Sequence, residues 1–453
     1  MSDRNQRRTE SDTTLLNYFV KTIGIQIGVV FAVMALLSIV FLCYQSVFSR
    51  QEQQGQNASA SDEDAAPVDE NTTPVNVPDT LNTVRSQYSF KEIYLSNTHP
   101  DVWYDDYTLW TNAKKRAIAK YGGAEETERA VQLALRWLNS RQSADGAWAI
   151  NSDNAKPSLN VNGATGLALL PFLAAGCLDS TSEYKDVVES GLNYLVQHGK
   201  TGEDFNGVRY CEPGEPFYNH ALAALALGET AVKTGKSEYF KAAKGALEYI
   251  AFCQSPDSGV WDSALSGQYD NFINTTWSVE ALKTAYRTSC NSAFVAASKA
   301  RLFLDSVQKA SKDACSTPDS ITTKAAQELL LRMYFYRFDS ISDLENSVER
   351  LCKIGPTDDS YYNYIATQIL FHYGGAPWKE WNAAMREKLI NAQIQTGTEA
   401  GSWDFSNEER SPNGAFSSSP LIDTALSALT LEIYYHSKPI YHEREYRKGF
   451  PTE

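Results

Sequence analysis

Residues 131–148 read VQLALRWLNSRQSADGAW, and this stretch decides the fold that the rest of the sequence predicts. Its apolar residues recur at the spacing of one helix face, at Val131, Ala134, Leu135 and Leu138. The helical pattern stops near Gln142, where a short polar turn follows. One amphipathic helix cannot bury its apolar face alone, so the unit predicts further copies of itself along the chain.

Two such copies follow, in which a glutamine at a helix end precedes a Gly-x-Trp turn. Near Tyr194 the sequence has the same helix ending, but the glutamine at the motif spacing and the Gly-x-Trp are absent. Because glycine permits a tight backbone approach and an indole buries a large apolar body, we interpret the motif as a structural seam between helix pairs. The motif residues are Trp137, Gln142, Gly146, Trp148, Gln254, Gly259, Trp261, Gly401 and Trp403.

The helical segments alternate between two kinds. Amphipathic segments are expected at 126–141, 183–197, 237–253, 293–310, 341–352 and 378–393, and segments apolar on nearly all faces at 164–176, 220–228, 276–285, 323–334, 361–373 and 421–435. A helix that is apolar all round must be surrounded by protein. The alternation therefore predicts an all-α fold, an α/α toroid of about six helix pairs with an outer layer packed on an inner one.

An uncharged, largely apolar run covers residues 22–49, which is long enough to cross a bilayer. Four basic residues precede it, and Arg50 alone follows closely. We predict a retained N-terminal transmembrane helix, a cytoplasmic N-terminus and a main domain that is periplasmic or otherwise extracytoplasmic. A cleaved signal peptide is the alternative. The preceding basic residues are Arg4, Arg7, Arg8 and Lys21.

The composition bounds the partners and the domain organisation. A net charge of -14 argues against nucleic acid, whose phosphates need a basic surface, and disfavours spontaneous docking to anionic lipid. The seven cysteines show no zinc-finger spacing, so disulfides and buried thiols both stay open. We expect a cytoplasmic tail at 1–21, the anchor at 22–49, a disordered acidic linker at 50–80, an entry segment at 81–122, the toroid at 123–436 and a C-terminal tail at 437–453.

The seam motif resembles the QW motif of the squalene cyclase and prenyltransferase repeat family, whose fold is an α/α toroid. The match is best from Trp137 to Trp148, and similarity covers roughly residues 120–440. Four further stretches resemble a membrane-anchored bacterial branch of that family: 121–123, 164–170, 218–222 and 361–364.

The family's chemistry does not carry over with the fold. Cyclases of this family protonate their substrate with an aspartic acid from an Asp-x-Asp-Asp or Asp-Cys-Thr-Ala-Glu stretch, and neither stretch is present. The related protein prenyltransferases hold zinc with Asp, Cys and His. Here Cys211 and His220 have no accompanying Asp-x-Cys, so we expect no metal site and no cofactor.

The starts of the inner helices are the best candidate site positions, because their backbone donors and helix dipoles favour polar ligands. His220 opens an apolar helix and could transfer protons, with Asp270 as an acid or base partner. A buried histidine bonded to Tyr218 or Glu215 is the structural alternative, and capping alone would explain several other positions. The expected ligand-binding residues are Tyr218, Asn271, Asn274, Tyr361, Asn363 and Asp423.

Two carboxylates lie within or at the end of apolar helices, at Glu280 and Glu229. Because an unpaired buried carboxylate is costly, we expect Lys283 and Lys233 to pair with them.

These observations predict a toroid that binds an apolar or isoprenoid ligand, or a protein partner, without the cyclase acid motif. The alternative is an enzyme, either a divergent terpenoid cyclase or a polysaccharide-processing enzyme that uses carboxylate and histidine groups in the toroid cavity.

Overall fold

The computed structural model describes residues 107–150, 159–261, 268–288, 290–313, 323–335, 340–405 and 419–436. The chain divides into two compact units, residues 1–77 and 78–453, and the described residues all belong to the second. The predicted cytoplasmic tail, anchor, linker and C-terminal tail lie outside the described residues. Among the helices that are described, none combines the length and hydropathy that a membrane span requires.

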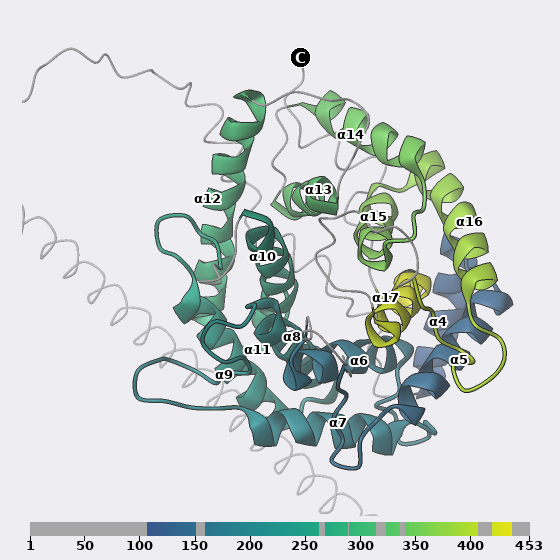
Figure 1. Cartoon of the computed structure of the whole chain (residues 1–453), viewed down its shortest axis with the longest axis horizontal. Coiled ribbons are helices and arrows are strands. Elements are labelled where there is room, and N and C mark those ends of the chain that lie inside the picture. The colour runs from purple at the N-terminus through teal and green to yellow at the C-terminus, as the bar shows by residue number, and fades with distance from the viewer. Residues whose placement is uncertain are drawn as a thin grey trace, which may run out of the picture. The chain divides into compact units, whose positions relative to one another are not determined.

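Six apolar helices form a closed inner ring (Figure 1). Each packs against the next along the chain, and the last packs back against the first, so the ring closes. In chain order they are α6 (Val161–Ala175), α8 (Tyr218–Thr234), α10 (Gln268–Leu282), α13 (Thr323–Phe335), α15 (Ser360–Tyr373) and α17 (Pro420–Leu431).

Six further helices surround this ring (Figure 1). They are α5 (Glu125–Ser140), α7 (Lys185–His198), α9 (Ser237–Cys253), α12 (Asn291–Asp313), α14 (Ile341–Ile354) and α16 (Gly375–Ala392). Each outer helix contacts inner helices, and α16 returns to pack against α5. The predicted α/α toroid of six helix pairs is confirmed by this closed alternation.

The inner and outer helices differ as their sequences predict. Outer helix α5 buries one face, which includes Val131, Leu135 and Leu138. Inner helix α6 is buried on every side from its third residue to its last but one. A Cβ atom on Gly166 would lie 2.6 Å from the carbonyl carbon of Leu222, so this glycine lets α6 approach α8 closely.

Three further helices complete the described fold. Helix α4 (Tyr107–Tyr121) packs against α18 (Ile433–His436), and α11 (Ala285–Thr288) packs against α8 and α9. The indole of Trp378 donates to the carbonyl of Tyr121 at 3.0 Å, which ties the entry segment to α16. The sequence predicts one helix over 421–435, whereas the structure breaks it at Glu432 into α17 and α18.

Three seams between helix pairs repeat the same polar contacts. In each copy the glutamine amide donates to the carbonyl of the motif glycine and to a carbonyl of another outer helix, at 2.8–2.9 Å. The motif tryptophan donates its indole N–H to a carbonyl four residues before that glutamine. The glutamines reach across the seam as follows: Gln142 to Val187, Gln254 to Ala296 and Gln393 to Ala130.

The motif glycines at these seams have positive φ angles of 91°, 70° and 97°. A Cβ atom there would lie 2.1–2.4 Å from a backbone carbonyl oxygen of the neighbouring outer helix, so no side chain fits. Gly146 meets Ser190, Gly259 meets Lys299 and Gly401 meets Leu133. The indole N–H of Trp137, the first tryptophan of the motif, donates to the carboxylate of Glu399 at 3.0 Å.

A fourth seam, between α7 and α9, lacks the glutamine and the tryptophan but keeps the glycine contact. Gly207 has a φ of 96°, and its Cβ atom would lie 2.3 Å from the carbonyl oxygen of Gly245. The backbone N–H of Val208 donates to that same oxygen at 2.8 Å. Backbone hydrogen bonding therefore replaces part of the missing side-chain contact at this seam.

Candidate functional site

Aromatic side chains fill the inside of the ring at the level of Trp277. This indole, on α10, stacks on Tyr361 and Tyr364 of α15 with ring centroids 5.9 and 5.8 Å away. Helix α13 lies between α10 and α15 in the ring, so the three side chains meet across the interior of the ring. All three are buried, at 1%, 2% and 5% exposure. The chain therefore fills this part of its own lumen.

A polar network lies beside these rings and joins three inner helices. Glu280 forms an ion pair with Lys283 at 3.0 Å, as the sequence predicts. The hydroxyl of Tyr334 lies 2.5 Å from the Glu280 carboxylate and 2.9 Å from the side-chain oxygen of Gln368. One hydroxyl proton serves only one of these acceptors, and the Gln368 amide nitrogen has no partner.

A second ionic network lies toward the C-terminal end of α8. Glu229 pairs with Lys233 at 3.1 Å, as expected from the sequence, and with His436 of α18 at 3.0 Å. Burial raises the pKa of Glu229, but the charges of Lys233 and His436 outweigh it and hold that pKa below its ordinary value. The Lys233 ammonium also donates to the carbonyl of Leu173 at 2.8 Å. The carboxylate therefore stays ionised inside the fold.

His220 is fully buried near the start of α8, and backbone groups engage both of its ring nitrogens. The N–H of Tyr210 donates to Nδ1 at 3.2 Å, and Nε2 lies 3.0 Å from the carbonyl oxygen of Ala246. Burial lowers the pKa of His220 to about 4. These contacts fit the structural alternative, although its bonding partners are Tyr210 and Ala246 rather than Tyr218 or Glu215. A catalytic role for His220 stays a prediction.

Asp270 belongs to the first turn of α10, but its side chain lies outside the described part of the structure. Asn271, the next residue, has a buried side-chain oxygen with no hydrogen-bond partner. The predicted pairing of Asp270 with His220 stays a prediction.

The other predicted site residues link neighbouring elements. The N–H of Tyr218 donates to the side-chain oxygen of Asn274 at 2.9 Å, which joins α8 to α10. Asp423 accepts from the hydroxyl of Ser360 at 2.6 Å, which joins α15 to α17. Asn363 bonds both backbone groups of a single residue, Thr357, at 2.9 and 2.7 Å. Tyr361 belongs to the aromatic stack. The contacts of Tyr218 with Asn274 and of Asp423 with Ser360 join neighbouring inner helices, whereas the Asn363 contacts are local to the start of α15, and the ligand-binding roles stay predictions.

Sequence reasoning missed Tyr334, Gln368, His436 and Glu432. Glu432 is fully buried at the break between α17 and α18, and its Oε2 atom has no hydrogen-bond partner. Burial raises its pKa well above the ordinary value. A carboxyl directly before an apolar aromatic run was the available signal, because such a group is costly to bury in its charged form.

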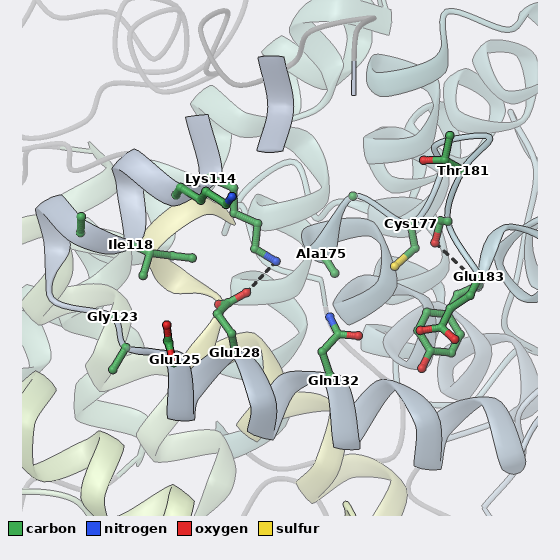
Figure 2. A pocket seen from close by; sticks show the side chains of 16 residues that line it. Lys114, Ile118, Gly123, Glu125, Glu128, Gln132, Ala175, Cys177, Thr181 and Glu183 are labelled. Atoms are coloured by element: carbon green, nitrogen blue, oxygen red, sulfur yellow. Dashed lines mark hydrogen bonds and ion pairs between the residues drawn. The ribbon is translucent and has the colours of Figure 1, made fainter. Parts of the chain in front are cut away.

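A pocket of about 860 Å³ opens between α4, the N-terminal half of α5 and the α6–α7 connection. Figure 2 shows Lys114 and Ile118 on one side, Glu128 and Gln132 along α5, and Cys177 and Glu183 on the other side. The sequence did not predict this pocket, because no local pattern shows how α4 and the α6–α7 connection lie against α5.

Cysteine and metal chemistry have little support in the described ranges. The five cysteines there carry free thiols, namely Cys177, Cys211, Cys253, Cys290 and Cys352. Burial raises the pKa of Cys177 to about 11 and that of Cys211 to about 12, so neither thiol is a reactive thiolate at neutral pH. Across the described residues, no group of three or more His, Cys, Asp or Glu side chains could hold a metal ion.

No protein-family model matches the chain, and no curated protein matches it in sequence. Among solved structures, a GH76 α-mannanase of Bacteroides thetaiotaomicron is 12% identical, with a TM-score of 0.48 over 71% of this chain and 98% of that chain. An inactive variant of a Salegentibacter α-1,6-mannanase, in complex with α-1,6-mannotriose, is 13% identical, with a TM-score of 0.45 over 69% and 99%. A type II terpene cyclase from Scytonema is 13% identical, with a TM-score of 0.42 over 69% and 97%.

These identities and TM-scores are too low to assign this chain a family or an activity. Membership of the squalene cyclase and prenyltransferase repeat family stays a prediction.

Proposed function

We propose that the toroid is a non-catalytic binding domain for a ligand or a protein partner. The predicted anchor at 22–49 would hold it at a membrane, on the extracytoplasmic side. The observation that carries this proposal is the stack of Trp277 on Tyr361 and Tyr364, which occupies the lumen where a toroid enzyme would place its substrate.

The protonation state and the ion pairs of the candidate catalytic groups support the same proposal. His220 is neutral near pH 7, and protonating its Nδ1 would break the hydrogen bond from the N–H of Tyr210. Glu229 and Glu280 are already paired with lysines. A general acid or base must instead be free to reach the proton that it transfers.

Ligand binding then belongs outside the lumen. The pocket between α4, α5 and the α6–α7 connection lies within the size range of small-molecule sites. We propose that this pocket, rather than the lumen, takes the ligand or the partner's side chain.

Replacing Trp277 by alanine tests the proposal. If the lumen is a core, Trp277→Ala lowers the melting temperature and leaves unchanged whatever co-purifies with the detergent-solubilised chain, as read by mass spectrometry. Thr181→Phe, which adds bulk to the pocket wall, should remove the co-purifying molecule. Loss of that molecule in Trp277→Ala alone, with an unchanged melting temperature, would place the ligand in the lumen and contradict the proposal.

A second candidate is a polysaccharide-processing enzyme, and one observation favours it. Burial raises the pKa of Tyr364 well above its ordinary value, and the charges of both Glu280 and Glu229 add to that shift. Two carboxyl groups, from the adjacent helices α10 and α8, therefore influence the same tyrosine hydroxyl, that of Tyr364. Glycoside hydrolysis uses a pair of carboxyl groups. Polysaccharide cleavage that disappears in Glu280→Gln and Glu229→Gln, with folding preserved, would establish this candidate.

A further inference from the structure

We propose that one exposed face of α4 docks on an anionic phospholipid surface and orients the toroid at the membrane. The face consists of Lys115, Arg116 and Lys120, all exposed, and we call it the basic face of α4. This inference rests on the proposed membrane attachment through residues 22–49 and adds a second membrane contact to it.

The charge of the chain is distributed unevenly. A net charge of -14 disfavours docking of the molecule as a whole to anionic lipid. Helix α4 nevertheless has no acidic residue, whereas each of the six outer helices has at least one. The basic residues of α4 are Lys114, Lys115, Arg116 and Lys120. An anionic surface can therefore be attracted to this helix although the chain is acidic overall.

The three residues of the basic face share one side of α4. Arg116 and Lys120 are one helical turn apart, and Lys115 is next to Arg116. Asn112, one turn before Arg116, is exposed as well. Ala113 is buried, and α4 packs against α18. The basic face is therefore the solvent side of the helix and is open to a partner.

No carboxylate neutralises the basic face. In the part of the chain that the structure describes, none of its three side chains forms an ion pair. The ammonium of Lys120 lies 4.8 Å from the ring centroid of its neighbour Tyr121. Other exposed lysines do find partners, as Lys353 does with Glu349 at 2.8 Å. The basic face thus differs from much of the charged surface in having no internal counterion.

Structural roles account for only part of the charge on α4. Lys114 is 14% exposed and pairs with Glu128 of α5 at 2.8 Å, as the dashed line in Figure 2 marks. Lys120 lies in the last turn of α4, where a cation offsets the negative end of the helix dipole. Lys115 and Arg116 have neither role. An external anion would supply the partner that these two exposed cations lack.

The acidic residues nearest α4 in sequence flank the basic face and do not interrupt it. Asp105 and Asp106 precede the helix, and Glu125 and Glu126 belong to the first turn of α5. Carboxylates just before a helix or in its first turn stabilise the positive end of the helix dipole. These four acidic residues therefore have a structural reason of their own.

Three basic side chains are a weak membrane anchor by themselves. The predicted anchor makes a weak contact sufficient, because α4 is the first described helix after it and residues 50–106 join the two. A flexible chain of that length spans roughly 40 Å on average. The bilayer surface would therefore stay within reach of α4.

Amine footprinting of the full chain in vesicles tests the docking. Acetylation of Lys115 and Lys120 should slow about threefold or more when phosphatidylglycerol is added to phosphatidylcholine vesicles, and high salt should reverse the change. Lys241 on α9 is exposed and is the internal control, whose rate should not change. Equal rates in the two kinds of vesicle would overturn the proposal. Slow labelling in both would also overturn it, because something other than anionic lipid would then cover α4.

Two triple variants with the same change in net charge locate the contact. The basic-face variant carries Lys115→Gln, Arg116→Gln and Lys120→Gln. The dispersed variant carries Lys241→Gln, Lys299→Gln and Lys379→Gln, which replace exposed lysines on α9, α12 and α16. A phosphatidylglycerol with a photoreactive headgroup should cross-link to α4 about tenfold less in the basic-face variant than in the dispersed variant or the unmodified chain. Equal yields in the two variants, with melting curves unchanged, would mean attraction to total charge and would overturn the proposal.

Vesicle flotation distinguishes this inference from the proposed anchor. Flotation of the full chain with pure phosphatidylcholine vesicles supports the anchor, whatever the footprint of α4 shows. Flotation that requires phosphatidylglycerol, and that the basic-face variant loses, would remove the anchor and keep the docking of α4. Flotation with phosphatidylcholine combined with equal footprints would keep the anchor and remove the docking.

Discussion

The side-chain amide of Gln393 donates a hydrogen bond to the carbonyl oxygen of Ala130 at 2.9 Å, across 263 positions of sequence. The same amide group holds the carbonyl of Gly401 at 2.9 Å. One side chain thus closes the outer layer by joining the end of α16 to α5. This seam acts together with the packing of α17 against α5 and α6, which also joins the last helices of the ring to the first.

Removing this amide should destabilise the closed ring. Gln393→Ala deletes two buried hydrogen bonds and should lower the free energy of unfolding by about 1–3 kcal/mol, measured by denaturant titration. Gln395→Ala is the matched control, because its amide bonds only the backbone carbonyl of Gln393 within the same turn. Equal effects of the two substitutions would contradict the closing role.

The glycines of the same turn separate steric contact from backbone strain. Gly401 and Gly397 both have positive φ angles, 97° and 82°, but a Cβ atom on Gly401 would lie 2.3 Å from the carbonyl oxygen of Leu133, whereas Gly397 has nothing within 4 Å. Gly397→Ala should therefore cost about 1–2 kcal/mol from strain alone, and Gly401→Ala clearly more. Thermal melting of the two variants side by side measures the difference, and similar melting temperatures would refute the steric account.

His220 should make stability depend on pH. Its folded pKa of about 4 lies below the ordinary 6.5, so the unfolded chain binds the proton first. This contribution is present in full above pH 6.5 and is lost as the pH falls toward 4, by about 3 kcal/mol. Urea titrations between pH 7.5 and 4 should show a shallower fall for His220→Gln than for the unmodified chain. An unchanged pH dependence would mean that His220 is not held neutral.

Replacing the buried carboxyls Glu229 and Glu432 by glutamine should lower the free energy of unfolding by very different amounts. Glu229→Gln leaves Lys233 buried without its carboxylate and should cost about 3 kcal/mol or more. Burial already raises the pKa of Glu432 well above its ordinary value, so Glu432→Gln replaces a neutral acid by a neutral amide at little cost. Chemical denaturation at pH 7 compares them, and a large loss in Glu432→Gln would show that this carboxyl is ionised.

The sequence predicts the fold well, because hydrophobic periodicity and the Gln and Gly-x-Trp spacing are local signals. The pattern of residues 131–148 predicts both the outer helix and the turn that follows it. The pairing of Glu280 with Lys283 and of Glu229 with Lys233 was also predictable, since each partner lies three or four positions away on the same helix. Local spacing is sufficient for such pairs.

The candidate site was less predictable, because it depends on contacts between distant segments. The stack of Trp277 on Tyr361 joins residues on non-consecutive helices, and no local pattern shows which face of each helix meets the lumen. Likewise, the Lys114–Glu128 ion pair joins α4 to α5, and α4 also packs against α18, which lies about 300 residues further along the chain. His220 attracted attention as a polar residue in an apolar helix, yet backbone groups of Tyr210 and Ala246 account for both of its nitrogens.

The most direct test of a non-catalytic lumen is a turnover assay on the full chain with polyprenyl and polysaccharide substrates, analysed by mass spectrometry. We expect no product from the unmodified protein or from Glu280→Gln. A product that the unmodified chain forms, that the exposed-site control Glu126→Gln also forms, and that Glu280→Gln abolishes with its fold intact, would contradict the account.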